Sequence, residues 1–269
     1  MQKELNNVVF RNVSLDDRLH QVSAFFAAGE CWHILGQNGA GKSTLFDLIA
    51  GLIAPAQGQL NVGEMQADDN LRLATFRTYL QQDCSLAFDL SAIELLQFYV
   101  DWPKDYWQNL DSSTSCSTLP KDIEHAFDVE RLLNKRVSCL SGGELQRLQV
   151  TRALLQIWPA LIQGSGIVLL DEPLQALDVA FQAACLEFLQ RLAKRGNTII
   201  LSVHDVNVPL QYASHVLMLK QGEVFASGPC RQQMTSENLS RLYDYPFTEF
   251  NDVNNSEKLF VRSPNTERL

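Results

Sequence analysis

The chain has 269 residues, of which 46% are hydrophobic and 20% are charged, a composition typical of a globular protein with a full core. Its 31 acidic and 22 basic residues give a formal net charge of −9. This balance argues against a nucleic-acid partner, because phosphate contacts require clustered lysine and arginine side chains. The sequence contains neither a secretory signal at its start nor an apolar run of about 18 residues. We therefore expect that the chain does not span a membrane by itself.

Short β-rich segments alternate with helical patterns, which indicates an α/β fold with a mainly parallel sheet. A buried strand is predicted over residues 31–36 and a helix over residues 42–51. The continuous apolar run at residues 167–171 is typical of a strand that is covered on both faces of a sheet. Further predicted elements are strands at 58–62, 78–81 and 198–203, an amphipathic helix at 179–194, and a hairpin of antiparallel strands at 216–219 and 224–226.

The middle of the chain has a different character from the segments on either side. Helical patterns cover residues 92–100 and 122–127, a polar loop lies between them at 111–118, and no strand pattern is convincing. We interpret this part as a helical lobe inserted into the α/β core. The predicted parts are an α/β core of residues 1–82 and 140–245, a helical lobe of residues 83–139, and a polar C-terminal tail of residues 246–269 with two short β-like runs.

The segment after the strand at 31–36 fits G-x-x-x-x-G-K-[ST], the pattern of a phosphate-binding loop. Its glycines allow the backbone to curl so that successive N–H groups face an anion, and the next helix directs its positive end to the same point. We expect Lys42 to reach the β- and γ-phosphates of ATP and Ser43 to offer its hydroxyl to Mg²⁺. The strand–loop–helix setting argues against a chance match. The predicted nucleotide-binding residues here are Gly36, Gln37, Asn38, Gly39, Ala40, Gly41, Lys42, Ser43 and Thr44.

Two carboxylates follow the apolar strand at 167–171, in the sequence Asp171-Glu172-Pro173. Ligands of open α/β sheets bind at the carboxyl ends of the strands. We expect Asp171 to hold Mg²⁺ and Glu172 to orient or deprotonate the attacking water. The alternative is an ordinary strand end with solvated acids, which the phosphate-binding loop makes less plausible.

The segment Leu140-Ser141-Gly142-Gly143-Glu144 precedes a long predicted helix. Ser141 is a good N-cap residue, and Glu144 completes a capping box, so a well-capped helix without further function is one interpretation. Placed between a phosphate loop and an Asp-Glu-Pro strand end, however, this segment resembles the signature of ABC ATPases. The resemblance implies that Ser141, Gly142 and Gly143 bind the γ-phosphate held by a second copy, and therefore that the chain works as a homodimer.

Other marks of the family occur in the expected order. Gln82 matches the glutamine of the Q-loop, which implies roles in catalysis and in Mg²⁺ binding. Asp178 matches the D-loop at the dimer interface and is assigned to nucleotide binding. His204 matches the switch histidine, which contacts the γ-phosphate. The other four histidines match no motif, and we interpret them as structural or surface residues.

Three positions depart from the family pattern. The family usually carries an aromatic residue that stacks on adenine, and residues 15–20 contain none. Gln81 stands where proline is common, and Gln175 stands where serine is usual. The resemblance therefore leaves the residue that binds adenine unassigned.

A single cassette with a short helical lobe resembles the ATP-binding subunit of a bacterial importer. This resemblance implies two transmembrane permease subunits as direct partners, a periplasmic substrate-binding protein as an indirect one, and a peripheral location on the cytoplasmic face of the inner membrane. We expect contact with the permease through residues 84–100.

Segments such as residues 153–159 and 202–207 resemble importer ATPases for cobalamin. ATPases for haem or ferric siderophores are the alternative, followed by a soluble ABC-type ATPase and a non-enzymatic nucleotide switch.

Overall fold

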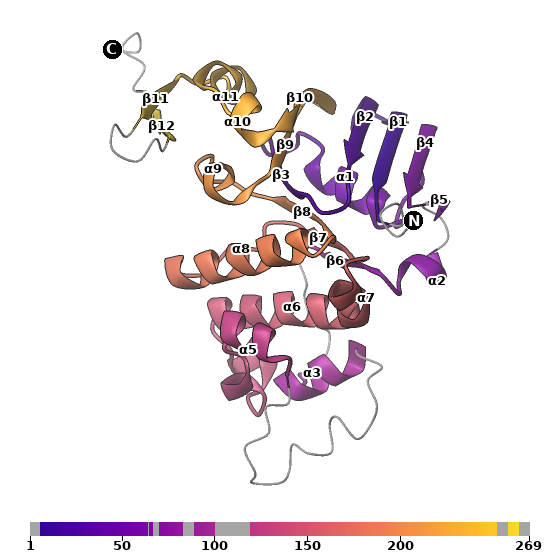
Figure 1. Cartoon of the computed structure of the whole chain (residues 1–269), viewed down its shortest axis with the longest axis vertical. Coiled ribbons are helices and arrows are strands. Elements are labelled where there is room, and N and C mark those ends of the chain that lie inside the picture. The colour runs from indigo at the N-terminus through magenta and orange to yellow at the C-terminus, as the bar shows by residue number, and fades with distance from the viewer. Residues whose placement is uncertain are drawn as a thin grey trace.

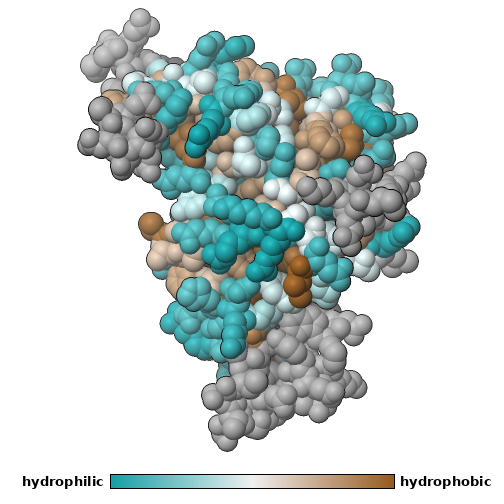
Figure 2. Space-filling view, viewed as in Figure 1, coloured by the Kyte–Doolittle hydropathy of each residue, from teal (hydrophilic) through white to brown (hydrophobic). Residues whose placement is uncertain are grey.

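Figure 1 shows a computed structural model of the chain. The structure describes residues 6–63, 65–66, 70–82, 89–99, 119–251 and 258–263. Within these residues, no helix is both long enough and apolar enough to cross a membrane. In Figure 2 hydrophilic side chains cover much of the visible face, and hydrophobic ones occur in small groups.

A six-stranded sheet forms the centre of the fold. All its neighbouring strands pair in parallel except the last two strands of this sheet in chain order, which form an antiparallel hairpin at one edge. This arrangement confirms the predicted mainly parallel sheet. In spatial order the strands are β10 (Glu223–Pro229), β9 (His215–Lys220), β3 (Cys31–Leu35), β8 (Thr198–Ser202), β7 (Ile167–Leu170) and β6 (Arg77–Leu80).

A second, antiparallel sheet of four strands lies beside the central one (Figure 1). Its strands, in spatial order, are β2 (Leu19–Phe26), β1 (Val8–Leu15), β4 (Gln57–Val62) and β5 (Met65–Gln66). The tight turn between β1 and β2 contains Asp16, Asp17 and Arg18, and Arg18 N donates to Leu15 O at 3.0 Å. This turn lies at one end of the candidate site described below.

The helices pack around both sheets. In Figure 1, α3, α5 and α6 lie together below the central sheet, and α8 lies between them and the strands. The α-helices in the described residues are α1 (Lys42–Ile49), α2 (Asn70–Leu73), α3 (Ala92–Tyr99), α5 (Lys121–Phe127), α6 (Gly142–Gln156), α7 (Trp158–Gln163), α8 (Val179–Lys194), α9 (Val208–Tyr212), α10 (Cys230–Gln233) and α11 (Ser236–Tyr243). Two 3₁₀ turns, η1 (Glu130–Leu132) and η2 (Val137–Cys139), connect α5 to α6.

The core has two halves, one on each face of the central sheet. Along β3, Trp32 and Ile34 enter the half shared with α1 and the antiparallel sheet, whereas Cys31 and Leu35 enter the half shared with α6 and α8. Alternate residues of a strand point to opposite faces. A strand covered on both sides is therefore buried on both faces. Strand β7 is buried and apolar at every position, and β3 carries one buried polar residue, His33.

Within the described parts of residues 83–139, the regular elements are helical, and β-pairing is limited to an isolated bridge between Ser91 and Arg136. The helical patterns expected at 92–100 and 122–127 correspond to α3 and α5. The polar loop expected at 111–118 lies outside the described residues, as do residues 84–88 and 100 of the segment expected to contact a permease.

The two β-like runs of the tail form a hairpin of β11 (Phe247–Asn251) and β12 (Lys258–Arg262). Phe247 and Phe260 are buried against the core. The Asn207 side chain donates to Phe260 O and accepts from Phe260 N at 2.7 Å. The hairpin is thereby attached to the loop that follows His204.

Candidate functional site

The phosphate-binding loop lies between β3 and α1, as the sequence predicts. Gly41 precedes α1 with φ 103°, a conformation that favours glycine. A Cβ at this position would lie 2.7 Å from Leu19 Cδ2 and 3.0 Å from Arg18 O. The loop can therefore pack this closely against the β1–β2 turn only with glycine at position 41.

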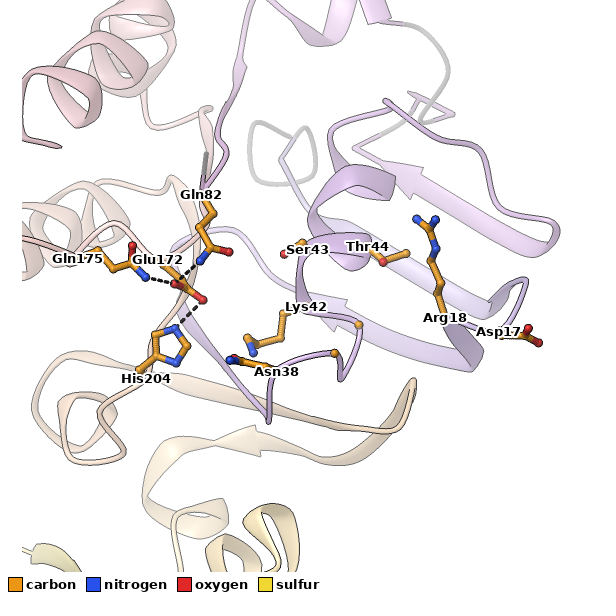
Figure 3. A pocket seen from close by; sticks show the side chains of 12 residues that line it. Asp17, Arg18, Asn38, Lys42, Ser43, Thr44, Gln82, Glu172, Gln175 and His204 are labelled. Carbon is orange, nitrogen blue, oxygen red and sulfur yellow. Dashed lines mark hydrogen bonds and ion pairs between the residues drawn. The ribbon is translucent and has the colours of Figure 1, made fainter. Parts of the chain in front are cut away.

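A cavity of about 510 Å³ lies over this loop (Figure 3). One wall is formed by Asn38, Gly39, Gly41, Lys42, Ser43 and Thr44. The facing wall is formed by Gln82, Glu172, Gln175 and His204, and Asp17 and Arg18 also contribute to the lining. The structure therefore brings together, around one cavity, the phosphate loop and residues from three segments far apart in the sequence.

Glu172 is the centre of the facing wall, and its side chain is 6% exposed. Its Oε1 lies 2.5 Å from His204 Nε2. Its Oε2 accepts a hydrogen bond from Gln82 Nε2 at 2.9 Å and a second from the side-chain amide of Gln175. A buried carboxylate requires partners of this kind, because burial without them would favour the neutral acid. The three partners fix the carboxylate in one orientation toward the loop.

Asp171 is also buried, and its two oxygens bind two hydroxyl groups. Ser43 donates to Asp171 Oδ2 at 2.6 Å, and Ser202 donates to Asp171 Oδ1 at 2.6 Å. Ser202 Oγ also accepts from the backbone N–H of Glu172 at 2.8 Å. Ser43, Asp171, Ser202 and Glu172 thus form a continuous hydrogen-bonded chain from the phosphate loop to the end of β7.

Lys42 is 7% exposed and lies on the floor of the cavity. Its ammonium donates to Gly36 O at 2.9 Å and to Gln37 O at 3.1 Å. Burial lowers the pKa of Lys42, and the nearby carboxylates of Glu172 and Asp171 oppose this shift. The cavity therefore combines a buried cation with backbone N–H groups at the start of α1, an arrangement suited to an anionic ligand.

The structure confirms the predicted capping box at the start of α6. Ser141 Oγ accepts from Glu144 N at 3.3 Å, and Glu144 Oε2 accepts from Ser141 N at 2.9 Å. The Lys135 ammonium and the bonds to Ser141 lower the pKa of Glu144 to about 2. Ser141 and Gly142 are exposed and do not line the cavity over the phosphate loop.

Two other predicted binding residues also lie away from this cavity. Asp178 caps α8, where its Oδ1 accepts from Phe181 N at 3.0 Å. The Gln37 amide points toward the C-terminal region and donates to Leu242 O at 3.1 Å and to Asp244 Oδ2 at 3.2 Å. Within a single chain, Ser141, Gly142, Gly143, Asp178 and Gln37 are thus separate from the cluster around Glu172.

Three residues that line the cavity, Asp17, Arg18 and Gln175, and Ser202 behind its wall have no role assigned from the sequence. Gln175 was noted only as a departure from the family pattern, yet its amide contacts the Glu172 carboxylate. Ser202 and Arg18 were not singled out, although both lie close in sequence to positions that were. The residue type in the D-loop offered a signal for Gln175, whereas the contacts of Ser202 and Arg18 require the three-dimensional structure.

The comparison with known families confirms the resemblance seen in the sequence. The profile of the ABC transporter family matches residues 19–175, more than half of the chain. The chain belongs to the ABC transporter family. The prediction of an ABC-type ATPase is thereby confirmed, together with its P-loop fold.

Curated relatives match this ABC cassette over most of its length. The vitamin B12 import ATP-binding protein BtuD of Yersinia pseudotuberculosis serotype I is 33% identical over 254 residues, which cover 94% of the chain and 97% of the relative. The protein of the same name from Vibrio cholerae serotype O1 is 32% identical over 234 residues, which cover 86% of the chain and 91% of the relative.

Solved structures show the same architecture. An ABC transporter of the metal-chelate type in an inward-facing conformation has a TM-score of 0.72 and 25% identity, and the match covers 98% of both chains. A dimeric ATP-binding cassette in a post-hydrolysis state with ADP and Pi has a TM-score of 0.65 and 25% identity, with 83% of this cassette and 99% of that chain covered.

Proposed function

We propose that this cassette is the ATP-hydrolysing subunit of a bacterial importer, and that the cargo is cobalamin. The observation that carries the proposal is the buried Glu172 carboxylate, held by three side chains and facing the phosphate loop across one cavity. The matches to vitamin B12 import proteins over nearly the whole chain support the cargo.

In this proposal the triphosphate of ATP lies along the phosphate loop. The backbone N–H groups before α1 and the Lys42 ammonium neutralise its charge. The γ-phosphate faces Glu172, whose carboxylate accepts a proton from the attacking water or orients it. His204, 2.5 Å from that carboxylate, donates to the γ-phosphate and keeps it aligned. Phosphoryl transfer depends mainly on such positioning and electrostatics.

The oxygen-rich contact between Ser43 and Asp171 suits a hard divalent cation. Ser43 Oγ and Asp171 Oδ2 are 2.6 Å apart and face the phosphate loop. The Gln82 side chain is the further candidate ligand on the same wall. When Mg²⁺ is bound there, it neutralises charge on the phosphate oxygens, and these residues hold its position.

We further propose that two copies form the complete enzyme. Ser141, Gly142 and Asp178 lie away from the single-chain cavity, as expected if they serve the nucleotide of a second copy. The likeness to a dimeric cassette with ADP and Pi supports this arrangement. The pair would bind two permease subunits on the cytoplasmic face of the inner membrane and act with a periplasmic binding protein only through them.

A haem or ferric-siderophore importer is the second candidate. The match to a metal-chelate transporter covers 98% of the chain, as nearly complete as the 94% covered by a vitamin B12 import protein.

The deciding experiment uses membranes of the organism that encodes the chain. Tagged cassette is purified from detergent extracts, the co-purifying permease is identified by mass spectrometry, and the complex is reconstituted in proteoliposomes. We expect ATP-dependent uptake of labelled cobalamin and none of haem or ferric siderophore. Uptake of either alternative cargo alone would overturn the cobalamin assignment, and absence of any permease would favour a soluble ATPase.

A further inference from the structure

The end of the cavity formed by the β1–β2 turn has no role in the chemistry described above. Asp17 and Arg18 line the cavity there, beyond Thr44 and on the opposite side of the phosphate loop from Glu172 (Figure 3). The turn is held in place: Leu19 is fully buried, and Gly41 allows Arg18 O to lie against the loop. The position of this cavity end relative to the loop is therefore fixed by the core.

The side chain of Arg18 is available for a ligand. The residue is exposed, and within the described residues its guanidinium makes no ion pair or hydrogen bond. By contrast, the other basic side chain of the cavity, Lys42, is buried and bound to two carbonyl groups. Arg18 is thus a planar cation without a partner at the edge of a nucleotide-sized space.

The direction of the bound nucleotide follows from the proposed function, on which this inference rests. If the γ-phosphate faces Glu172 and the triphosphate follows the loop past Lys42 and Ser43, the ribose and base extend past Thr44. They then reach the β1–β2 turn. Among the described residues that line the cavity there is no phenylalanine, tyrosine or tryptophan, and the imidazole of His204 lies against Glu172 at the other end. Stacking on the base must therefore come from another planar group.

The geometry points to Arg18 as that group. We propose that its guanidinium stacks on the face of the adenine ring and takes the place of an aromatic side chain. Guanidinium groups stack on aromatic faces and on nucleobases, and they attract the π-system as cations. Lysine cannot replace arginine in this role, because its ammonium has no plane.

The test compares ATP with inorganic tripolyphosphate, which has the phosphates but no base. Dissociation constants for both are measured with Mg²⁺ by isothermal titration calorimetry on the full chain. We expect Arg18→Ala to weaken ATP binding by about five- to thirtyfold, in line with the loss of a base-stacking contact. Tripolyphosphate binding should change less than about twofold. Arg18→Tyr should restore ATP binding, whereas Arg18→Lys should not. Arg11→Ala, an exposed arginine of β1 outside the cavity, is the matched control.

Two outcomes would overturn the stacking role. Equal weakening of ATP and tripolyphosphate, with rescue by Arg18→Lys, would mean that Arg18 acts on phosphate charge alone. Unchanged ATP binding in Arg18→Ala would mean that the base lies elsewhere. Failure of the proposed nucleotide-binding site, on which the inference rests, has a different signature, because the wild-type chain would then bind neither ATP nor tripolyphosphate.

Discussion

Glu172 has a backbone conformation that a residue with a side chain rarely adopts. Its φ is 54°, in the left-handed region where a non-glycine residue is strained. The backbone bond to Ser202 Oγ and the side-chain contacts to Gln82, Gln175 and His204 hold it there. Strain maintained by this many contacts at a cavity wall is consistent with a group whose orientation matters for chemistry.

The first prediction concerns the charge of this group. Glu172→Gln preserves size but removes the carboxylate, so we expect ATP binding to persist and steady-state turnover to fall by roughly a hundredfold or more, since general-base contributions are typically of this size. Phosphate release and nucleotide binding measure the two effects separately. Glu187→Gln, on the exposed face of α8, is the control. Wild-type turnover in Glu172→Gln would remove this residue from the catalytic role.

The second prediction concerns His33, which is fully buried with neither ring nitrogen hydrogen-bonded within the described structure. Burial lowers the pKa of His33 from 6.5 to about 3. Between these two pH values the unfolded chain holds a proton there that the folded chain does not, so this residue makes stability fall as pH falls. A difference of one proton corresponds to about 1.4 kcal/mol per pH unit.

We therefore expect His33→Leu to reduce the acid-side loss of stability between pH 6.5 and the onset of acid unfolding. It should also raise the free energy of unfolding at pH 7, because the buried ring has no partners. Urea unfolding at several pH values measures both effects, and His125→Gln, an exposed histidine, serves as the control. An unchanged pH dependence in His33→Leu would contradict the assignment.

At the scale of elements, the start of α6 and the loop before α8 are packed together. A Cβ at Gly143 would lie 2.8 Å from Ala176 O, whereas one at Gly142 would lie 3.5 Å from Ala176 Cβ. Gln146, one turn further along α6, donates to Pro173 O at 3.0 Å. The signature segment is thus in contact with the segment that follows Glu172 within the same chain. A movement of the N-terminal end of α6 would therefore displace residues 173–176 as well.

The third prediction uses these adjacent glycines. Gly143→Ala should destabilise the fold relative to Gly142→Ala by about 1–3 kcal/mol, the usual cost of an added methyl group in a packed site. Helix propensity favours alanine over glycine by up to about 1 kcal/mol at both positions, so it does not account for a difference. Urea unfolding without nucleotide provides the measurement. Equal stabilities would mean that Ala176 moves away freely.

Buried strands could be predicted from the sequence more readily than half-buried ones. The continuous apolar run at residues 167–171 and the largely apolar segments 31–36 and 198–203 each contain a buried strand. Strands β1 and β2 were not predicted individually, because Asn12 and Gln21 have φ values of 50° and 49° and the register shifts there. Irregular positions of this kind interrupt the alternation by which a half-buried strand is recognised.

For the site, motif spacing grouped the phosphate loop with Gln82, Glu172 and His204, and these three residues line one cavity with Asn38, Gly39, Gly41, Lys42, Ser43 and Thr44. It did not indicate that Gly36, Gln37 and Ala40 lie outside this lining. It could not predict that the Gln175 amide binds the Glu172 carboxylate, because glutamine in the D-loop has several possible partners. Nor could it place Arg18, whose position depends on how tightly the β1–β2 turn packs against Gly41.

At the scale of the whole molecule, the signature segment lies away from the cavity over the phosphate loop of the same chain. Ser141 and Gly142 are exposed, and Val179, at the start of α8, is 82% exposed. Both features lie next to the loop around Ala176. A surface that presents the N-terminus of α6 beside an exposed apolar residue is suited to a second copy carrying a bound phosphate.

The fourth prediction follows from this surface. Glu172→Gln with saturating Mg²⁺ and ATP should sediment as a dimer, whereas the nucleotide-free protein should sediment as a monomer. Adding Ser141→Arg should keep the protein monomeric, because a long cation would then occupy the signature segment. Analytical ultracentrifugation provides the measurement, and Ser236→Arg, at the start of the distant α11, is the control. A monomer at all ATP concentrations would contradict the dimeric enzyme.

The attachment of the C-terminal hairpin has a practical consequence for anyone who modifies this protein. Asn207 binds both backbone groups of Phe260 and lies three residues after His204. A chain shortened before β12 would lose both bonds, and the histidine loop would lose its anchor while every motif residue remained intact. Affinity tags and truncations at this hairpin therefore belong among the variables of any activity assay, since β11 and β12 help to hold the cavity wall that carries His204.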